Sequence, residues 1–380
     1  MSKNYSTHFV LWFLVHLLLI EINCQTAPFK PLRRESHTST HIDDKLYILG
    51  GRNEAGDIKL TSAASVRGGI NNKTLFLHGG FPYTENEVTL VYTFDTQSNS
   101  WSIPKITGDI TIRKDNLKAI VDDNGKMYLF GGQSNETITN DMLILDTINL
   151  KWGIGASIDA PSPRAVYIAT YFSKQFIVYL GGYYATTKND GVSLSLKEIY
   201  YYDMHGDMWL IRVNSGTIPS DRDSFSAVLG LDGQRLIIFG GANYLNNLNP
   251  QDALYVLNLA NYEWYIPKIS GTIPGSRYWH QANVIGKYMI ISFEYSYDIN
   301  VDNDILLLDI SNNEEYVWTN IFDPNSTPTD SSKNSTNDSF TKAPTNYNWC
   351  NYSNLRFYLH KWKKNKEEYN EAIPTAGNAI

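Results

Sequence analysis

Histidines at positions 37 and 41 are the first residues whose type and spacing could support chemistry. His37 and His41 lie four residues apart, so they share one face if the segment is a strand. Two imidazoles could share a metal ion, but no third ligand follows at a convincing spacing. We therefore expect packing or solvent-exposed roles for both side chains, and the sequence predicts no metal site.

A run of acidic and amide side chains near position 300 superficially matches the spacing of a calcium-binding loop. It extends from Asp298 to Asp304, but Asn303 stands where such a loop needs glycine and Asp309 where it needs glutamate. A similar pattern ends at Asp146 in another part of the chain. We interpret these residues as members of a structural repeat.

The sequence lacks the common catalytic and nucleotide-binding motifs. It contains no GxSxG, P-loop, GxGxxG or HExxH phrase. Its two cysteines, Cys24 and Cys350, form neither a CxxC pair nor a disulfide framework. No nucleophile or general base can be named, so the prediction is a protein that is not an enzyme and has no cofactor.

Loop tyrosines are the most promising side chains for binding. The candidate ligand-binding residues are Tyr83, Tyr183, Tyr184, Tyr244, Tyr295 and Tyr297. They stand among Asn and Thr, a composition that suits contact with proteins or sugars. We predict that these loops contact a ligand or partner; the alternative is that they are plain solvent loops.

A repeated strand pattern must position these loops. Between Arg222 and Trp264 the sequence predicts four short strands, separated by turns rich in Gly, Asn and Asp. The second strand ends in a glycine pair, which recurs as Gly50-Gly51, Gly79-Gly80, Gly131-Gly132, Gly181-Gly182 and Gly240-Gly241. A tryptophan closes the units at Trp101, Trp152, Trp209, Trp264 and Trp318. One such unit cannot bury both of its faces, so the copies must stack on one another.

The repeat resembles the kelch repeat. Besides the glycine pairs and tryptophans, several units open with a Pro-x-x-Arg phrase that ends in His or an aromatic residue, namely Pro31/Arg34/His37, Pro161/Arg164/Tyr167, Pro219/Arg222/Phe225 and Pro274/Arg277/His280. The resemblance implies an all-β fold, a kelch-type β-propeller, and a role in protein–protein interaction.

Each repeated residue type has a structural reason to recur. A glycine pair permits positive φ and a close approach of neighbouring backbone. A tryptophan places a large apolar face between units while its N–H finds a carbonyl. We predict that the repeated Arg satisfies backbone carbonyls where one unit meets the next.

The sequence predicts about six blades, of which two are irregular. The first blade reaches Gly51 and then lacks its third and fourth strands, because the next opening strand begins near Thr61. We expect a two-stranded remnant rather than completion by the C-terminal part. The sixth blade is degenerate, since Tyr288–Tyr295 contains no glycine pair. Whether the ring closes is left open.

Galactose oxidase uses kelch-type blades, and its resemblance implies a copper site of tyrosines and histidines with a cysteine crosslink. Here no cysteine lies between residues 25 and 349. Five histidines lie there, and His37 and His280 occupy the repeat-opening phrase. A copper radical oxidase is therefore not expected.

The segments outside the repeats predict a secreted glycoprotein. Residues 1–24 read as a signal peptide, with an uncleaved signal anchor as the alternative. The propeller is expected over 25–322, a Ser/Thr/Asn-rich glycosylated stalk over 323–354, and a basic disordered tail over 355–380. The glycosylation sequons are Asn72, Asn135, Asn325, Asn334, Asn337 and Asn351. The tail resembles the cytoplasmic flank of a membrane span, but no apolar run of 18 residues precedes it.

Together these features predict a non-catalytic extracellular binding module. A net charge of −7 argues against nucleic-acid binding. The expected partner is a cell-surface or extracellular protein, or a glycan, held at the loop face of the propeller. The alternative is an extracellular carbohydrate-binding or galactose-oxidase-like protein.

Overall fold

The computed structural model describes residues 34–323, except 53–57, 82–88, 109, 111, 136, 188–189, 244–252, 294 and 297–304, together with the strand 356–359. Within these ranges the chain forms strands and turns and no helix. They all belong to one compact unit of the chain.

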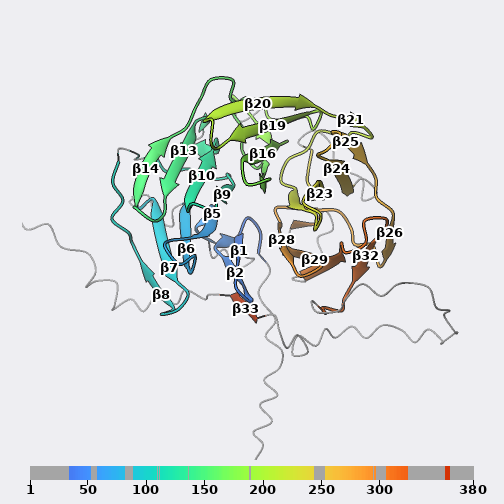
Figure 1. The fold of residues 1–380 in the computed structure, drawn as a ribbon, viewed down its shortest axis with the longest axis horizontal. Helices are drawn as coiled ribbons and strands as arrows, with labels where there is room; N and C mark the ends of the chain where they lie inside the picture. The colour runs from blue at the N-terminus through green and yellow to red at the C-terminus, as the bar shows by residue number, and fades with distance from the viewer. Residues whose placement is uncertain are drawn as a thin grey trace, which may run out of the picture. The chain divides into compact units, whose positions relative to one another are not determined.

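Five sheets, each built on four antiparallel strands, follow one another along the chain, and we number them blades 2 to 6 (Figure 1). Blade 2 contains β5 (Thr61–Gly68), β6 (Thr74–Phe81), β7 (Val91–Asp95) and β8 (Ser100–Ser102). Blade 3 contains β9 (Ala119–Val121), β10 (Lys126–Phe130), β13 (Met142–Asp146) and β14 (Lys151–Ile154). Blade 4 contains β15 (Ile168–Phe172), β16 (Phe176–Leu180), β19 (Glu198–Asp203) and β20 (Met208–Val213). Blade 5 contains β22 (Ser226–Leu229), β23 (Arg235–Phe239), β24 (Leu254–Asn258) and β25 (Glu263–Tyr265). Blade 6 contains β28 (Gln281–Ile285), β29 (Tyr288–Ser292), β31 (Ile305–Asp309) and β32 (Tyr316–Thr319).

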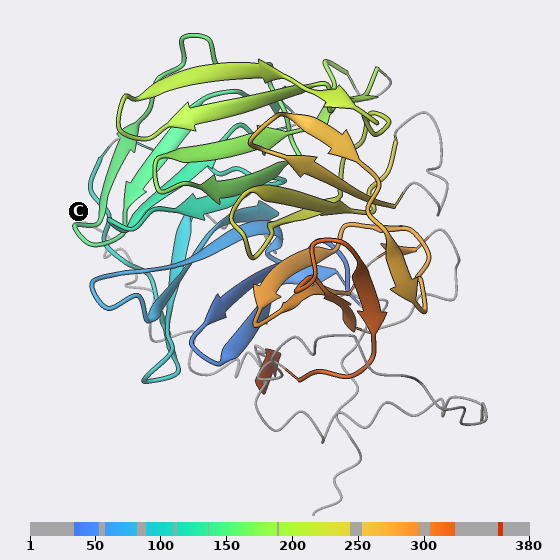
Figure 2. The same cartoon turned by 45° about the vertical axis from the view of Figure 1, so that its right-hand side comes forward.

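The second strand of each blade is the most apolar because neighbouring blades cover both of its faces. In β23, for example, every residue after Arg235 is buried. The segment entering a blade can add a short parallel strand at the outer edge, as β21 (Ser215–Gly216) does beside β25 and β26 (Ile269–Gly271) beside β32. Figure 2 shows the strands of successive blades stacked face to face.

Blade 1 is incomplete, as the sequence predicted. Its own strands are β1 (Thr38–Ile42) and β2 (Lys45–Leu49), which pair antiparallel. A third strand, β33 (Arg356–Leu359), pairs parallel with the outer side of β2. The expectation of a two-stranded remnant without a C-terminal contribution was therefore wrong, because Arg356–Leu359 lies in a basic segment without the repeat pattern and gave no strand signal.

Blade 6 is degenerate in sequence but keeps all four strands. Phe293 occupies the place of the first glycine of the pair and has a φ of 43°, close to the 66° of Gly240. The ring contacts of the blades therefore impose a left-handed backbone here without glycine.

The inner strands of the six blades form a closed ring. One residue of each blade donates its backbone N–H to the carbonyl of the corresponding residue in the preceding blade, at 2.8–3.2 Å. These residues, all with positive φ, are Ser36, Ser62, Asn116, Val166, Ser224 and Trp279. Ser36 N–H donates to Trp279 O, which joins blade 1 to blade 6 and completes the circle. We call this set the backbone ring.

The glycine pairs and the opening Arg residues join adjacent blades, as predicted. The second glycine donates its N–H to the carbonyl of the next blade's Arg, as in Gly241 N to Arg277 O at 2.8 Å. The Arg side chain in turn donates to the first glycine of its own blade, as Arg164 Nη1 does to Gly181 O at 3.2 Å. In blade 3, Lys114 replaces Arg and donates to Gly131 O at 3.1 Å.

The tryptophans lie between blades, which confirms their predicted role. Trp209 packs on Phe130 of the preceding blade with ring centroids 4.7 Å apart. Its Nε1 donates to Ala156 O at 2.8 Å, and Trp264 Nε1 donates to Leu196 O at 3.3 Å. The indoles of Trp209 and Trp264 thus bury apolar area and satisfy one carbonyl at the same time, whereas the buried Nε1 of Trp318 has no hydrogen-bond partner among the described residues.

Short hairpins extend several blades beyond the glycine pairs. They are β3 (Gly51–Arg52) with β4 (Ile58–Lys59), β11 (Gln133–Ser134) with β12 (Thr137–Ile138), and β17 (Tyr183–Tyr184) with β18 (Val192–Ser193). In blade 6, β27 (Arg277–Tyr278) pairs antiparallel with β30 (Tyr295–Ser296), although β28 and β29 lie between them in the sequence. The residue just before the backbone ring pairs with such a hairpin in blade 4, where Ala165 bridges Tyr183. The hairpins and the backbone ring therefore share one end of the propeller, which we call the loop face.

Candidate functional site

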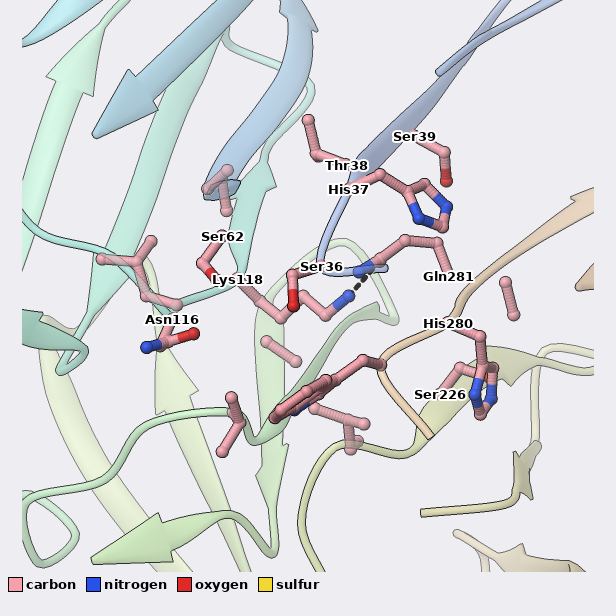
Figure 3. Close-up of a pocket in the computed structure, with 18 of the residues that line it drawn as sticks. Ser36, His37, Thr38, Ser39, Ser62, Asn116, Lys118, Ser226, His280 and Gln281 are labelled. Carbon is pink, nitrogen blue, oxygen red and sulfur yellow. Dashed lines mark hydrogen bonds between the residues drawn. The ribbon is translucent and has the colours of Figure 1, made fainter. Parts of the chain in front are cut away.

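A cavity of about 260 Å³ lies at the centre of the ring and opens beside the hairpins. Its walls are the starts of the six inner strands β1, β5, β9, β15, β22 and β28 together with the backbone ring. We call this cavity the channel. The side chains around it are mostly small or polar, including Ser36, Ser62, Asn116 and Gln281 (Figure 3).

One lysine brings a positive charge into the channel. Lys118, from β9's leading end, reaches across to Gln281 of β28 and donates a hydrogen bond to its side-chain oxygen (Figure 3). Blades 3 and 6 are on opposite sides of the ring, so this bond spans the channel. The surrounding protein disfavours the charged form and lowers the pKa of Lys118 to about 8.

Lys118 and Gln281 occupy equivalent positions in their blades. Each lies two residues after its member of the backbone ring, and the full layer is Thr38, Ala64, Lys118, Ile168, Ser226 and Gln281. Among the residues that line the channel there is no Asp, Glu or Arg, and Lys118 is the one lysine. Ser226 is buried, and within the described ranges its Oγ has no hydrogen-bond partner.

His37 and His280 touch the channel wall but serve the scaffold. His37 Nε2 lies 3.0 Å from Ser292 Oγ and its ring packs on Phe293, while His280 Nε2 lies 3.2 Å from Phe239 O. Burial lowers the pKa of His37 well below its usual value and that of His280 to about 3. Both imidazoles are therefore neutral, and no group of three or more metal-ligating side chains forms within the described ranges.

Buried carboxylates help to hold the loop face together. Asp223, which precedes Ser224 of the backbone ring, accepts hydrogen bonds from Ser224 Oγ at 2.7 Å and from Ser193 Oγ at 2.6 Å. The second bond ties strand β18 of blade 4 to blade 5. Burial raises the pKa of Asp223, and it raises that of the equivalent Asp115 to about 7.

The structure describes two of the six predicted binding tyrosines with their side chains. Tyr183 and Tyr184 are half-buried in β17 and pair with Ser193 and Val192. Tyr295 lies in β30 opposite Tyr278, with only its backbone described. The remaining three, Tyr83, Tyr244 and Tyr297, lie outside the described residues. Blade 4 therefore presents an ordered tyrosine pair on the loop face, and a binding role stays a prediction for all six tyrosines.

Two of the six sequons fall within the described ranges. Asn72 is exposed in the turn between β5 and β6, and Asn135 is exposed in the turn between β11 and β12. The other four lie outside them, at Asn325, Asn334, Asn337 and Asn351. Both turns leave room for a glycan, while glycosylation itself stays a prediction.

Asp309, the residue at the end of the calcium-like run, is a turn former. Its Oδ1 accepts the N–H of Ser311 at 3.0 Å, and its other oxygen lies 2.9 Å from Lys287 Nζ. Asp146 caps the equivalent turn in blade 3 by accepting the N–H groups of Ile148 and Asn149. This confirms that these residues belong to the repeat; Asp298–Asp304 lies outside the described residues.

Sequence reasoning missed the layer of Lys118 and Gln281. The available signal was positional: the layer follows the opening Arg or Lys by four residues, so aligning the units would have revealed one charged member. The channel end of each inner strand carries a different residue type, so composition gave no signal.

Several known proteins resemble this chain. Kelch domain-containing protein 3 of Rattus norvegicus is 29% identical over 262 residues, which cover 66% of this chain and 59% of that protein. Host cell factor 2 of Homo sapiens is 26% identical over 276 residues, which cover 69% of this chain and 30% of that protein. The chain thus spans less than two thirds of the length of these relatives.

A solved structure and a family profile agree with the fold. The structure titled YjhT aligns with a TM-score of 0.59 and 14% identity, covering 77% of this chain and 99% of that chain. Within the described ranges, no helix has the length and apolar content needed to cross a membrane.

The profile of one propeller family matches residues 75–293, from β6 of blade 2 to the end of β29 in blade 6. The chain is a kelch-type propeller and belongs to the Attractin/LZTR1 beta-propeller family.

Proposed function

We propose that this chain is a non-catalytic binding module whose loop face holds a protein partner. The observation that carries the proposal is the ordered β17–β18 hairpin, which presents Tyr183 and Tyr184 beside the mouth of the channel. Tyrosines supply rigid contact area with a polar tip, which suits protein recognition. The similarity to Kelch domain-containing protein 3 and Host cell factor 2 supports a protein-interaction role.

The hairpin is held in place by a hydrogen bond within blade 4 and by another to the adjacent blade 5. Leu194 N–H donates to Gly182 O at 2.7 Å, and Ser193 Oγ donates to Asp223. At the tip, Asp190 accepts the N–H groups of Thr186 and Thr187. A surface pre-organised in this way loses less conformational entropy on binding.

We place this module outside the cell. The support is the sequence of residues 1–24, which reads as a signal peptide, and the sequons, two of which are exposed. A membrane-associated form through an uncleaved signal anchor is the alternative. The partner is accordingly expected to be a cell-surface or extracellular protein.

The test uses the full chain as bait for cell-surface and extracellular extracts, with bound proteins and glycans identified by mass spectrometry. The identified partner is then titrated against the Tyr183→Ala/Tyr184→Ala double variant. The control is Tyr171→Ala at the other end of blade 4, where β15 approaches the turn into β16. We expect at least a tenfold loss of affinity for the double variant only; equal affinity for all three proteins contradicts the loop-face proposal.

A further inference from the structure

The channel holds a positive charge that no lining carboxylate balances. Lys118 projects into it, and the residues that line it include no Asp or Glu. A cation removed from water is costly unless an opposite charge or several hydrogen bonds compensate it. The side-chain oxygen of Gln281 is the single hydrogen-bond partner of Nζ among the described residues.

The ammonium retains donor capacity beyond this bond. A lysine Nζ carries three N–H donors, and the bond to Gln281 uses one of them. The amide nitrogen of Gln281 adds further donors at the same level of the channel. Ser226, in the same layer, contributes a buried hydroxyl without a partner in the described part of the chain.

More hydroxyl donors stand at the mouth above this layer. Ser36 and Ser62 belong to the backbone ring, where their backbone N–H groups are already used, and Figure 3 shows both beside Lys118. Among the described residues, neither Oγ has a hydrogen-bond partner. A small acceptor entering from the loop face would therefore meet hydroxyls first and the ammonium below them.

The size and charge of the channel limit the size and charge of the ligand that it can bind. A volume of about 260 Å³ is below the ~300–1,000 Å³ of pockets for drug-sized ligands. One unbalanced positive charge matches a monoanion better than a dianion, which would leave a buried negative charge. A carboxylate also offers two acceptor oxygens to separate donors.

We propose that the central channel binds a small organic carboxylate, with Lys118 as its charged contact and Gln281 and Ser226 as neutral donors. This site is independent of the partner surface on the hairpins. The carboxylate displaces the bond between Lys118 and Gln281 and pairs with the ammonium in its place. Inorganic monoanions and phosphate are the competing ligands that the experiment separates.

The test follows the Lys118 side chain directly in the full chain labelled with ¹³Cε-lysine. The Lys118→Met variant assigns its NMR signal, and acetate, lactate, chloride and phosphate are the probes. We expect acetate and lactate to shift the Lys118 signal with a dissociation constant below ~10 mM, and to leave the exposed Lys126 signal unmoved. Calorimetry should show that the affinity for the carboxylate falls at least tenfold in Lys118→Met. It should be unchanged in the matched control Lys126→Met.

Three outcomes would overturn the proposal. The first is a Lys118 signal that no carboxylate moves. The second is a shift by chloride or phosphate at equal or lower concentration than by acetate. The third is equal carboxylate affinity for Lys118→Met and wild type. Ser226→Ala, a smaller change in the same layer, should weaken binding severalfold and guards against misfolding of the lysine variant.

Discussion

At the scale of single residues, the channel depends on a half-buried lysine and two buried histidines that face the same region. Lys118 electrostatically lowers the pKa of both His37 and His280, to which burial makes the larger contribution. Burial in the ring raises the free energy of the charged forms of these three side chains. Their titration should therefore report directly on the folded channel.

The pKa of Lys118 should be measurable by NMR and should lie near 8. Because this value is below that of an unfolded lysine, the unfolded chain binds more protons between pH 8 and about 10.4. The free energy of unfolding should gain a positive contribution as pH rises through this window. In Lys118→Met, urea unfolding at pH 8 and pH 10 should lack that gain; an identical pH dependence would show that Lys118 titrates normally.

His280 should make the propeller sensitive to acid. Its pKa is about 3 in the folded state, against about 6.5 unfolded, so the unfolded chain takes up the proton first and stability falls between pH 6.5 and 3. In blade 4 the equivalent Tyr167 donates its hydroxyl to Phe130 O. His280→Tyr should therefore retain a hydrogen bond to Phe239 O and lower the slope of unfolding free energy against pH. A slope equal to that of wild type would contradict the assignment.

At the scale of elements, the glycine pair is the contact on which blade stacking depends. A Cβ placed on Gly240 would lie 2.1 Å from Arg277 O in the next blade. Gly233 has a similar φ of 67° but no atom within 4 Å of such a Cβ. The two glycines share backbone strain and differ only in the space around them.

Alanine substitutions should separate these effects. Gly233→Ala should cost about 1 kcal/mol, the penalty of a left-handed non-glycine residue. Gly240→Ala should cost roughly 3 kcal/mol or more, because the backbone of the next blade must also move. Denaturant unfolding at neutral pH measures both. Equal costs would mean that blade contact adds nothing to the strain.

The sequence predicted these elements well because their residues are tied to a repeated geometry. Gly-Gly, Arg and Trp each have one physical reason to recur, so six units and their order could be read from them. The backbone ring could not, because Ser36, Val166 and Trp279 take one conformation with three unrelated side chains. That conformation is imposed by inter-blade hydrogen bonds, which no local preference reveals. The third strand of blade 1 was missed for a different reason, because Arg356–Leu359 lies in a basic segment that lacks the repeat pattern.

At the scale of the whole propeller, the ring is closed by polar contacts between blades 6 and 1. Asn283 Nδ2 donates to Ser39 Oγ at 2.6 Å, and His37 lies against Ser292. Elsewhere apolar clusters span the boundaries, as between blades 5 and 6. Polar contacts gain less from excluding water.

The boundary between blades 6 and 1 should therefore open first. Native-state hydrogen exchange should show faster exchange for the ring amide of Ser36 than for that of Val166. The two amides make equivalent bonds, so a difference reports the opening of the boundary. Slower exchange at Ser36 would place the weakest boundary elsewhere.

The most direct test of the central claim is the hydrogen-exchange footprint of the partner on the full chain. A partner held at the loop face should protect the β17–β18 hairpin and the neighbouring β11–β12 hairpin, and leave the outer strands β14 and β20 unchanged. Protection confined to the outer strands, with the hairpins unaffected, would contradict the assignment of the loop face as the binding surface.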